Sequence, residues 1–270
     1  AMDRHPEFPD GWQAVFILVA LFGLELLLWA VLSDAGFTTR ANELQYGTVV
    51  QVLGNGVVFS LLLHHKGLSY GELFHSGRST FKSVMIIAGL PALLAATGLF
   101  FLVWNVDALI ERLIPMSYSE MRMFERMMQE GAISFVVLCV VAPFLEEMLF
   151  RGIFLRSFLR RYPESYAIAL SALLFGAMHM NLYQFVTGLV MGIFLGWIYA
   201  RTRSLWPCIA IHAWNNFLAF VFSSSESSPS GEGPWFFSSL IVLTLSVFAV
   251  AAGVLVLNLV FGAGRSKREA

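Results

Sequence analysis

Two carboxylates and a guanidinium lie close together in one apolar stretch of the chain. Residues 142–151 read APFLEEMLFR and contain Glu146, Glu147 and Arg151. Glu147 and Arg151 are four residues apart, so on a helix they share one face and can pair, whereas Glu146 points about 100° away. The spacing predicts an ion pair between Glu147 and Arg151 that leaves Glu146 free for other chemistry. A buried ion-pair network that only holds helices together is the alternative interpretation.

Further polar side chains interrupt two later apolar stretches. His179 ends the run FGAMH, and His212 and Asn216 are four residues apart in IHAWNN. Hydrolysis of an amide needs a group that deprotonates water, donors that hold the oxyanion and an acid for the leaving amine. With Glu146, these three side chains are of the required types. The chain has neither the Gly-x-Ser-x-Gly nor the His-Glu-x-x-His pattern, so a serine hydrolase or a common zinc protease is not favoured.

The composition identifies the class of protein that carries these groups. The chain has 270 residues, of which 57% are hydrophobic and 13% charged, and its mean hydropathy is +0.71. These values are typical of a membrane protein. The net charge of −1 excludes a basic surface for nucleic acid. Ionisable side chains are costly inside a bilayer, so those within apolar stretches are functional candidates.

A helix that spans a bilayer needs about 20 apolar residues. The sequence has eight apolar runs of this kind, and the fifth is short, which predicts that it ends among its neighbours or re-enters the membrane. The expected fold is an all-α polytopic membrane helix bundle with an intramembrane active site, forming one integral membrane domain over 1–270. The runs are 12–33, 46–64, 81–104, 133–155, 166–180, 183–200, 205–222 and 235–261.

Other segments are predicted to position or surround the site. Residues 106–130 mix charges with five methionines, which predicts an amphipathic helix at the membrane surface. Gly188, Gly192 and Gly196 form a smooth face that favours close packing inside the chain, with dimerisation as the lesser alternative. Glu25 is predicted to meet Gln51 and Asn55 in a polar contact between the first two spans.

The orientation in the membrane follows from the basic residues near the ends of the spans. With both termini in the cytoplasm, most Lys and Arg residues lie on the cytoplasmic side, as the positive-inside rule requires. Both termini are therefore predicted to be cytoplasmic. The compact chain without a targeting extension predicts the bacterial inner membrane.

The three motifs together resemble those of a known family. Glu146-Glu147-x-x-x-Arg151, Phe175-x-x-x-His179 and His212-x-x-x-Asn216 are similar to the motifs of the intramembrane proteases that include type II CAAX prenyl proteases and the bacteriocin-processing and abortive-infection proteins. The resemblance covers a core of about 133–222, and residues 1–132 add N-terminal spans and the amphipathic segment.

The resemblance implies an endopeptidase that cleaves membrane-associated or lipidated peptides. In that family the first Glu, here Glu146, activates water with help from His179, and His212 and Asn216 hold the oxyanion. No cofactor is expected, although zinc or another divalent metal on Glu146, His179 and His212 stays an alternative. A non-proteolytic scaffold or immunity protein of the same fold and a proton-coupled transporter are the competing functions. Oligomeric state and substrate identity stay open.

Overall fold

The structure is a computed structural model, and it describes residues 8–39, 42–77, 79–129, 131–225 and 240–266. Every regular element in these ranges is a helix, and the one β-type pairing is an isolated bridge between His75 and Ser204. The all-α fold is confirmed. In chain order the elements are α1 (Gly11–Asp34), α2 (Glu43–Lys66), α3 (Tyr70–Phe74), α4 (Phe81–Leu113), α5 (Tyr118–Gln129), α6 (Ala132–Val136), η1 (Val137–Val141), α7 (Ala142–Glu147), η2 (Met148–Leu155), α8 (Arg156–Arg161), α9 (Glu164–Ala177), α10 (Leu182–Thr202), α11 (Leu205–Ser225) and α12 (Leu240–Ser266).

Seven helices among the described residues are long and apolar enough to cross a membrane. The fifth predicted span, 166–180, is α9, whose 14 residues rise only about 21 Å, less than the roughly 30 Å of a bilayer core. It therefore packs inside the bundle instead of crossing on its own. The protein is a multi-pass membrane protein. The start of the last predicted span, 235–239, lies outside the described residues.

The predicted amphipathic segment 106–130 is divided differently from the prediction. Residues up to Leu113 continue α4, which reaches 33 residues, and only Tyr118–Gln129 form the separate helix α5. The prediction of one surface helix was wrong, because α4 continues past Trp104 into the residues where the charges of this segment begin. Thr187 on α10 donates to Asp107 at 3.2 Å, so this extension packs against the bundle.

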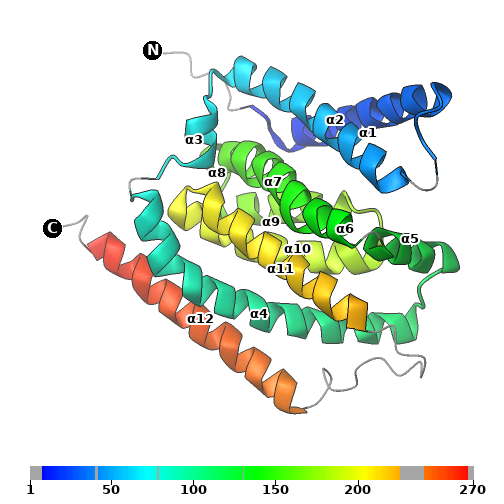
Figure 1. Ribbon diagram of the computed structural model, residues 1–270. Coiled ribbons are helices and arrows are strands. Elements are labelled where there is room, and N and C mark those ends of the chain that lie inside the picture. Colours follow the sequence, from blue (N-terminus) through cyan, green and yellow to red (C-terminus); the bar gives the residue numbers. More distant parts are fainter. Residues whose placement is uncertain (1–7, 40–41, 78, 130, 226–239, 267–270) are drawn as a thin grey trace.

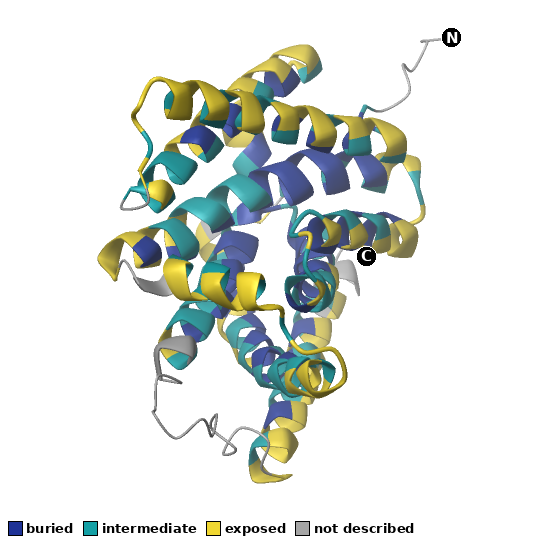
Figure 2. Ribbon diagram, turned by 90° about the vertical axis from the view of Figure 1, so that its right-hand side faces the viewer, coloured by how far each residue is buried: buried dark blue, intermediate teal, exposed yellow. Residues whose placement is uncertain are grey.

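The bundle has a buried centre and outer helices that face lipid. In Figure 1, α1 and α2 lie at one edge and α12 at the opposite edge, with α7, α9, α10 and α11 between them. Figure 2 shows the buried residues gathered in the central helices. In the most apolar part of each span, 50% of residues are buried in α10, against 11% in α1 and 17% in α12. The central helices are therefore the part of the bundle where polar side chains are best covered by other parts of the chain.

Small residues let the central helices approach closely. A Cβ added at Gly192 would lie 2.8 Å from the Cβ of Ala172 on α9, and one at Gly188 would lie 3.0 Å from the Cα of Gly176. The glycines of α10, which are four residues apart, thus let α9 and α10 pack closely within the chain, as predicted. This contact places the end of α9 beside the helices that carry the other site residues.

Candidate active site

The helical segment that carries Glu146 and Glu147 contains two π-helical turns. The π-helix η1 precedes α7, and the π-helix η2 follows directly after Glu147. Pro143 at the start of α7 has no N–H, and its ring clashes with the carbonyl four residues earlier in a regular α-helix. The wider turn of η1 relieves this clash. Such turns are common at functional sites.

Glu147 and Arg151 form a fully buried ion pair. Arg151 Nη1 donates to Glu147 Oε1 at 2.8 Å, and both side chains are 0% exposed. Arg151 Nη2 also donates to the carbonyl of Gly192 at 3.4 Å, and the guanidinium lies 4.5 Å from the ring centroid of Phe175. Arg151 thereby connects η2 to α9 and α10. The pair predicted from the sequence spacing is present.

His212 lies between the two carboxylates. Its Nδ1 is 2.8 Å from Glu147 Oε1, and its Nε2 is 3.7 Å from Glu146 Oε2. Because a carboxylate accepts hydrogen bonds, Nδ1 carries the proton in the contact with Glu147. In the neutral ring Nε2 is then an acceptor that faces Glu146. Glu147 thus orients the imidazole, as the carboxylate does in other carboxylate–histidine arrangements.

His179 lies at the end of α9 and reaches the same region through Phe175. Its Nδ1 is 2.9 Å from the carbonyl oxygen of Phe175, which leaves Nε2 without a partner among the described residues. The ring of Phe175 meets His179 at 5.3 Å and His212 at 5.6 Å between centroids, edge to face in both cases. Among the described residues, no hydrogen bond or ion pair joins Glu146 to His179. The imidazole closest to Glu146 is therefore His212, not the predicted His179.

A tight turn between α9 and α10 sets the position of His179. Asn181 caps α10 by accepting from Gln184 N at 2.8 Å, and its Nδ2 donates to the His179 carbonyl at 3.1 Å. Met180 between them has φ 54°, a left-handed conformation that is costly for a side chain of this size. Backbone strain of this kind clusters at functional sites.

Asn216 is held by a carbonyl that the π-helix supplies. Its Nδ2 donates to Leu138 O in η1 at 2.8 Å, and among the described residues no hydrogen bond joins it to His212. The convergence of His212 and Asn216 on one point, predicted from their spacing, is not shown. Asn216 keeps a second N–H that can donate elsewhere.

Several positioning groups were not predicted from the sequence. Phe175 stands in one of the motifs without an assigned role, and neither Asn181 nor the Leu138 carbonyl has a role predicted from the sequence. The Asn-x-x-Gln pattern at 181–184 is a helix-start signal that identifies the cap. The partners of Phe175 depend on the packing of three helices and have no counterpart in the sequence.

The donor atoms do not gather as a metal site in this arrangement. Among the described residues, no group of three or more His, Cys, Asp or Glu side chains is placed to hold a metal ion. His212 gives Nδ1–H to Glu147 and turns Nε2 toward Glu146. The alternative ligand set of Glu146, His179 and His212 stays a prediction.

A known protein family matches the part of the chain that holds the candidate site. The family described as "Type II CAAX prenyl endopeptidase Rce1-like" matches residues 128–218. The match covers part of the chain, about a third of its length. All six candidate site residues lie within the matched segment: Glu146, Glu147, Arg151, His179, His212 and Asn216.

One relative has a similar description. The protein "Putative membrane peptidase YdiL" of Bacillus subtilis (strain 168) is 31% identical over 81 residues, which are 30% of this chain and 33% of that relative. The match thus spans about a third of the length of the relative. No solved structure matches the chain.

Proposed function

We propose that the protein is an intramembrane endopeptidase that hydrolyses peptide bonds with water activated by Glu146. One observation carries the proposal: a buried imidazole, His212, is oriented by Glu147 and faces Glu146 at 3.7 Å. The arrangement lies in the segment that matches a family of endopeptidases. Carboxylates and imidazoles placed in this way supply general acid–base catalysis.

The geometry supports a division of roles. The separation between Nε2 and Glu146 Oε2 exceeds a direct hydrogen bond, so a water beside the pair can bond to both atoms. Glu146 accepts a proton from this water as its oxygen attacks the peptide carbonyl carbon, and the proton then passes to the leaving nitrogen. Nε2 of His212 holds the water in place.

The oxyanion needs donors near the attacked carbonyl. His179 has a free Nε2, and Asn216 keeps one N–H after its bond to Leu138. Asn216 can donate to the oxyanion once the peptide is bound, and a donor held by its own partner is the effective kind. His179 gives its Nδ1–H to Phe175, so its Nε2 can donate only when the ring carries a second proton. Glu147 and Arg151 act as positioning residues.

The substrate proposed is a membrane-associated or lipidated peptide, because the site lies among spanning helices and its segment matches a family described as a CAAX prenyl endopeptidase family. The proposed location is the bacterial inner membrane with both termini in the cytoplasm, since that orientation places most Lys and Arg residues inside. Cysteine labelling at the two ends of the chain in sealed cells tests the orientation.

The experiment that tests the function is cleavage of quenched peptides by the protein reconstituted in liposomes. Glu146→Gln, His212→Ala and His179→Ala should each lower kcat by about 100-fold or more, with thermal midpoints near that of the unmodified protein. His64→Ala, an exposed histidine at the end of α2, is the matched control and should cleave normally. Full activity in Glu146→Gln would refute its role. Proton-dependent flux without cleavage would favour a transporter, and neither activity would favour a scaffold.

A further inference from the structure

A cavity beside the active site is not used by the proposed mechanism. It lies between α4, α10 and α11, has a volume of about 150 Å³, and is lined by eight residues that include Asp107, Asn215 and Trp104. Asn215 is three residues after His212 on α11, and the lining residue Met191 precedes Gly192, whose carbonyl accepts from Arg151. The cavity is therefore about one helical turn from the site on two helices.

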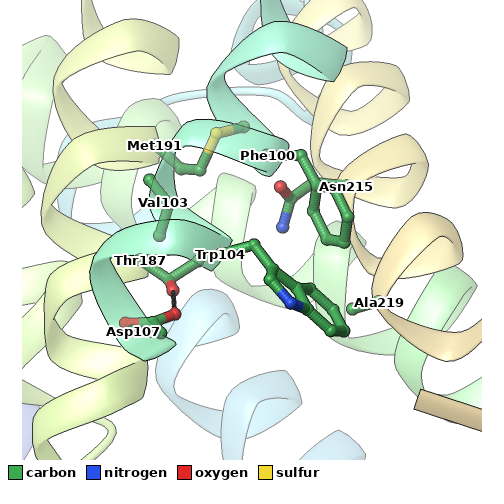
Figure 3. Close-up of a pocket in the computed structure, with 8 residues that line it drawn as sticks. All are labelled: Phe100, Val103, Trp104, Asp107, Thr187, Met191, Asn215 and Ala219. Carbon is green, nitrogen blue, oxygen red and sulfur yellow. Dashed lines mark hydrogen bonds between the residues drawn. The ribbon is translucent and has the colours of Figure 1, made fainter. Parts of the chain in front are cut away.

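Two buried oxygens at this cavity have no partner within the described chain. Asp107 Oδ2 accepts from Thr187 at 3.2 Å, but Asp107 Oδ1 has no hydrogen bond. Asn215 is 7% exposed, and its Oδ1 is also without a partner. Figure 3 shows the Asn215 amide within the cavity, with the Thr187–Asp107 bond at the far end from it. Unpaired buried polar atoms are uncommon and require an explanation.

The lining combines acceptor oxygens with aromatic rings. Phe100 and Trp104 contribute the rings, and in Figure 3 both lie beside the Asn215 amide. Aromatic faces attract ammonium groups, and a carboxylate in a low-dielectric region requires a compensating positive charge or a proton. The amide can present its oxygen to a donor, because no other bond fixes its orientation. Acceptors and aromatic rings together select a cation with N–H donors.

We propose that this cavity is a substrate subsite that binds the primary ammonium of a lysine side chain next to the cleaved peptide bond. The inference rests on the proposed endopeptidase function, because it assigns the occupant to the substrate. The size is suitable, since cavities of about 150 Å³ hold groups as large as benzene. An ammonium at the Asp107 end can donate to Asp107 Oδ1, and the alkyl chain behind it then passes the aromatic rings and Asn215.

The first test compares lysine with norleucine, which has a similar length but no charge. Quenched apolar peptides carry one or the other at each position around the cleaved bond, and kcat/KM is measured in liposomes. At one position lysine should be preferred about tenfold or more, as expected for a hydrogen bond to a charged group. Asp107→Asn should bring the lysine-to-norleucine ratio close to one. Glu111→Gln, which removes an exposed carboxylate one turn further on α4, should keep the preference.

The second test does not depend on proteolysis. n-Butylammonium should raise the thermal midpoint of the unmodified protein and of Glu111→Gln in detergent but not that of Asp107→Asn, and n-butanol should have no such effect. Thr187→Val, which removes the donor to Asp107, serves as a second variant if Asp107→Asn does not fold, and it should also lower the lysine preference.

The outcomes separate the two proposals. Cleavage without any lysine preference, or a preference that Asp107→Asn retains, overturns the subsite and leaves the endopeptidase function intact. Absence of cleavage of every peptide refutes the endopeptidase, and the binding test then decides the amine site alone. Equal thermal shifts with n-butylammonium and n-butanol overturn it.

Discussion

Two clusters of polar side chains lie in the apolar helices of this protein, and they differ in what surrounds them. In the outer pair of helices, Asn55 on α2 donates to Glu25 on α1 at 3.3 Å and to the carbonyl of Gln51 at 2.9 Å. In the central helices, Glu147 receives both Arg151 and His212 at 2.8 Å on one oxygen. The outer cluster joins two neighbouring helices, as predicted, whereas the central cluster joins helices far apart in the chain.

The difference shows that an ionisable residue in an apolar span is not by itself evidence of catalysis. Glu25 is half-buried. Its hydrogen bond with the Asn55 amide links α1 to α2, and such contacts are common between membrane helices. In the central cluster, the pair of Glu147 and Arg151 leaves Glu146 and one nitrogen of His212 facing each other. In addition to burial, a reactive arrangement requires groups of this kind, whose hydrogen-bonding capacity is left for a substrate or a water.

The largest expected effect comes from leaving one buried charge without its partner. Arg151→Met should destabilise the protein by about 3–5 kcal/mol, because Glu147 then has no compensating cation. Denaturant unfolding in detergent measures the change. Arg151→Met combined with Glu147→Gln should recover much of the loss, since neither charge is then buried.

A matched control for Arg151→Met exists on the surface. Arg122 and Glu125 on α5 form a pair at 3.3 Å with half-exposed side chains, so Arg122→Met should leave the unfolding midpoint unchanged. If Arg151→Met were as stable as the unmodified protein, the central ion pair would not be a structural requirement of the site.

The next effect concerns the close contact of α9 with α10. Gly192→Ala should cost about 1–3 kcal/mol, the usual range for overpacking, because its Cβ would lie 2.8 Å from that of Ala172. Peptide cleavage should also fall, since separating the two helices moves Phe175 and His179. Gly23→Ala, with no atom within 4 Å of the added Cβ, should change neither stability nor cleavage, and equal behaviour of the two variants would contradict this account.

A smaller change in stability but a clear change in activity is expected at the cap of α10. Asn181→Ala removes the cap and the donor to the His179 carbonyl, so stability should fall by about 1 kcal/mol. Cleavage should fall by up to about 100-fold, as displacement of a reacting group by 1 Å can cause. Thr80→Ala removes the side-chain cap of α4, at 3.3 Å from Ser83 N, and should affect stability without affecting kcat. Normal cleavage by Asn181→Ala would show that this turn does not set the position of His179.

The smallest effect is expected in the outer cluster. Asn55→Leu should reduce stability by about 0.6 kcal/mol, the average for hydrogen bonds between membrane helices, with kcat unchanged. The measurements are unfolding in detergent and peptide cleavage in liposomes. A large loss of cleavage would show that the two clusters act together and would remove the distinction drawn between them.

Much of the organisation was predictable because it depends on local sequence. Apolar runs of about 20 residues identify the spanning helices, and spacings of four residues identified the Glu147–Arg151 pair and the glycine face of α10. These features need only the period of the helix. The same reasoning identified the three motifs, and the family comparison covers the segment that holds them.

Other features were decided by the packing of helices onto one another. Helical periodicity did not predict the π turns on either side of α7. It also did not predict that His212, 65 residues after Glu147, would be the imidazole beside the carboxylates while His179 lies behind Phe175. Which nitrogen faces which oxygen depends on the angle and distance between helices, and those are properties of the whole bundle.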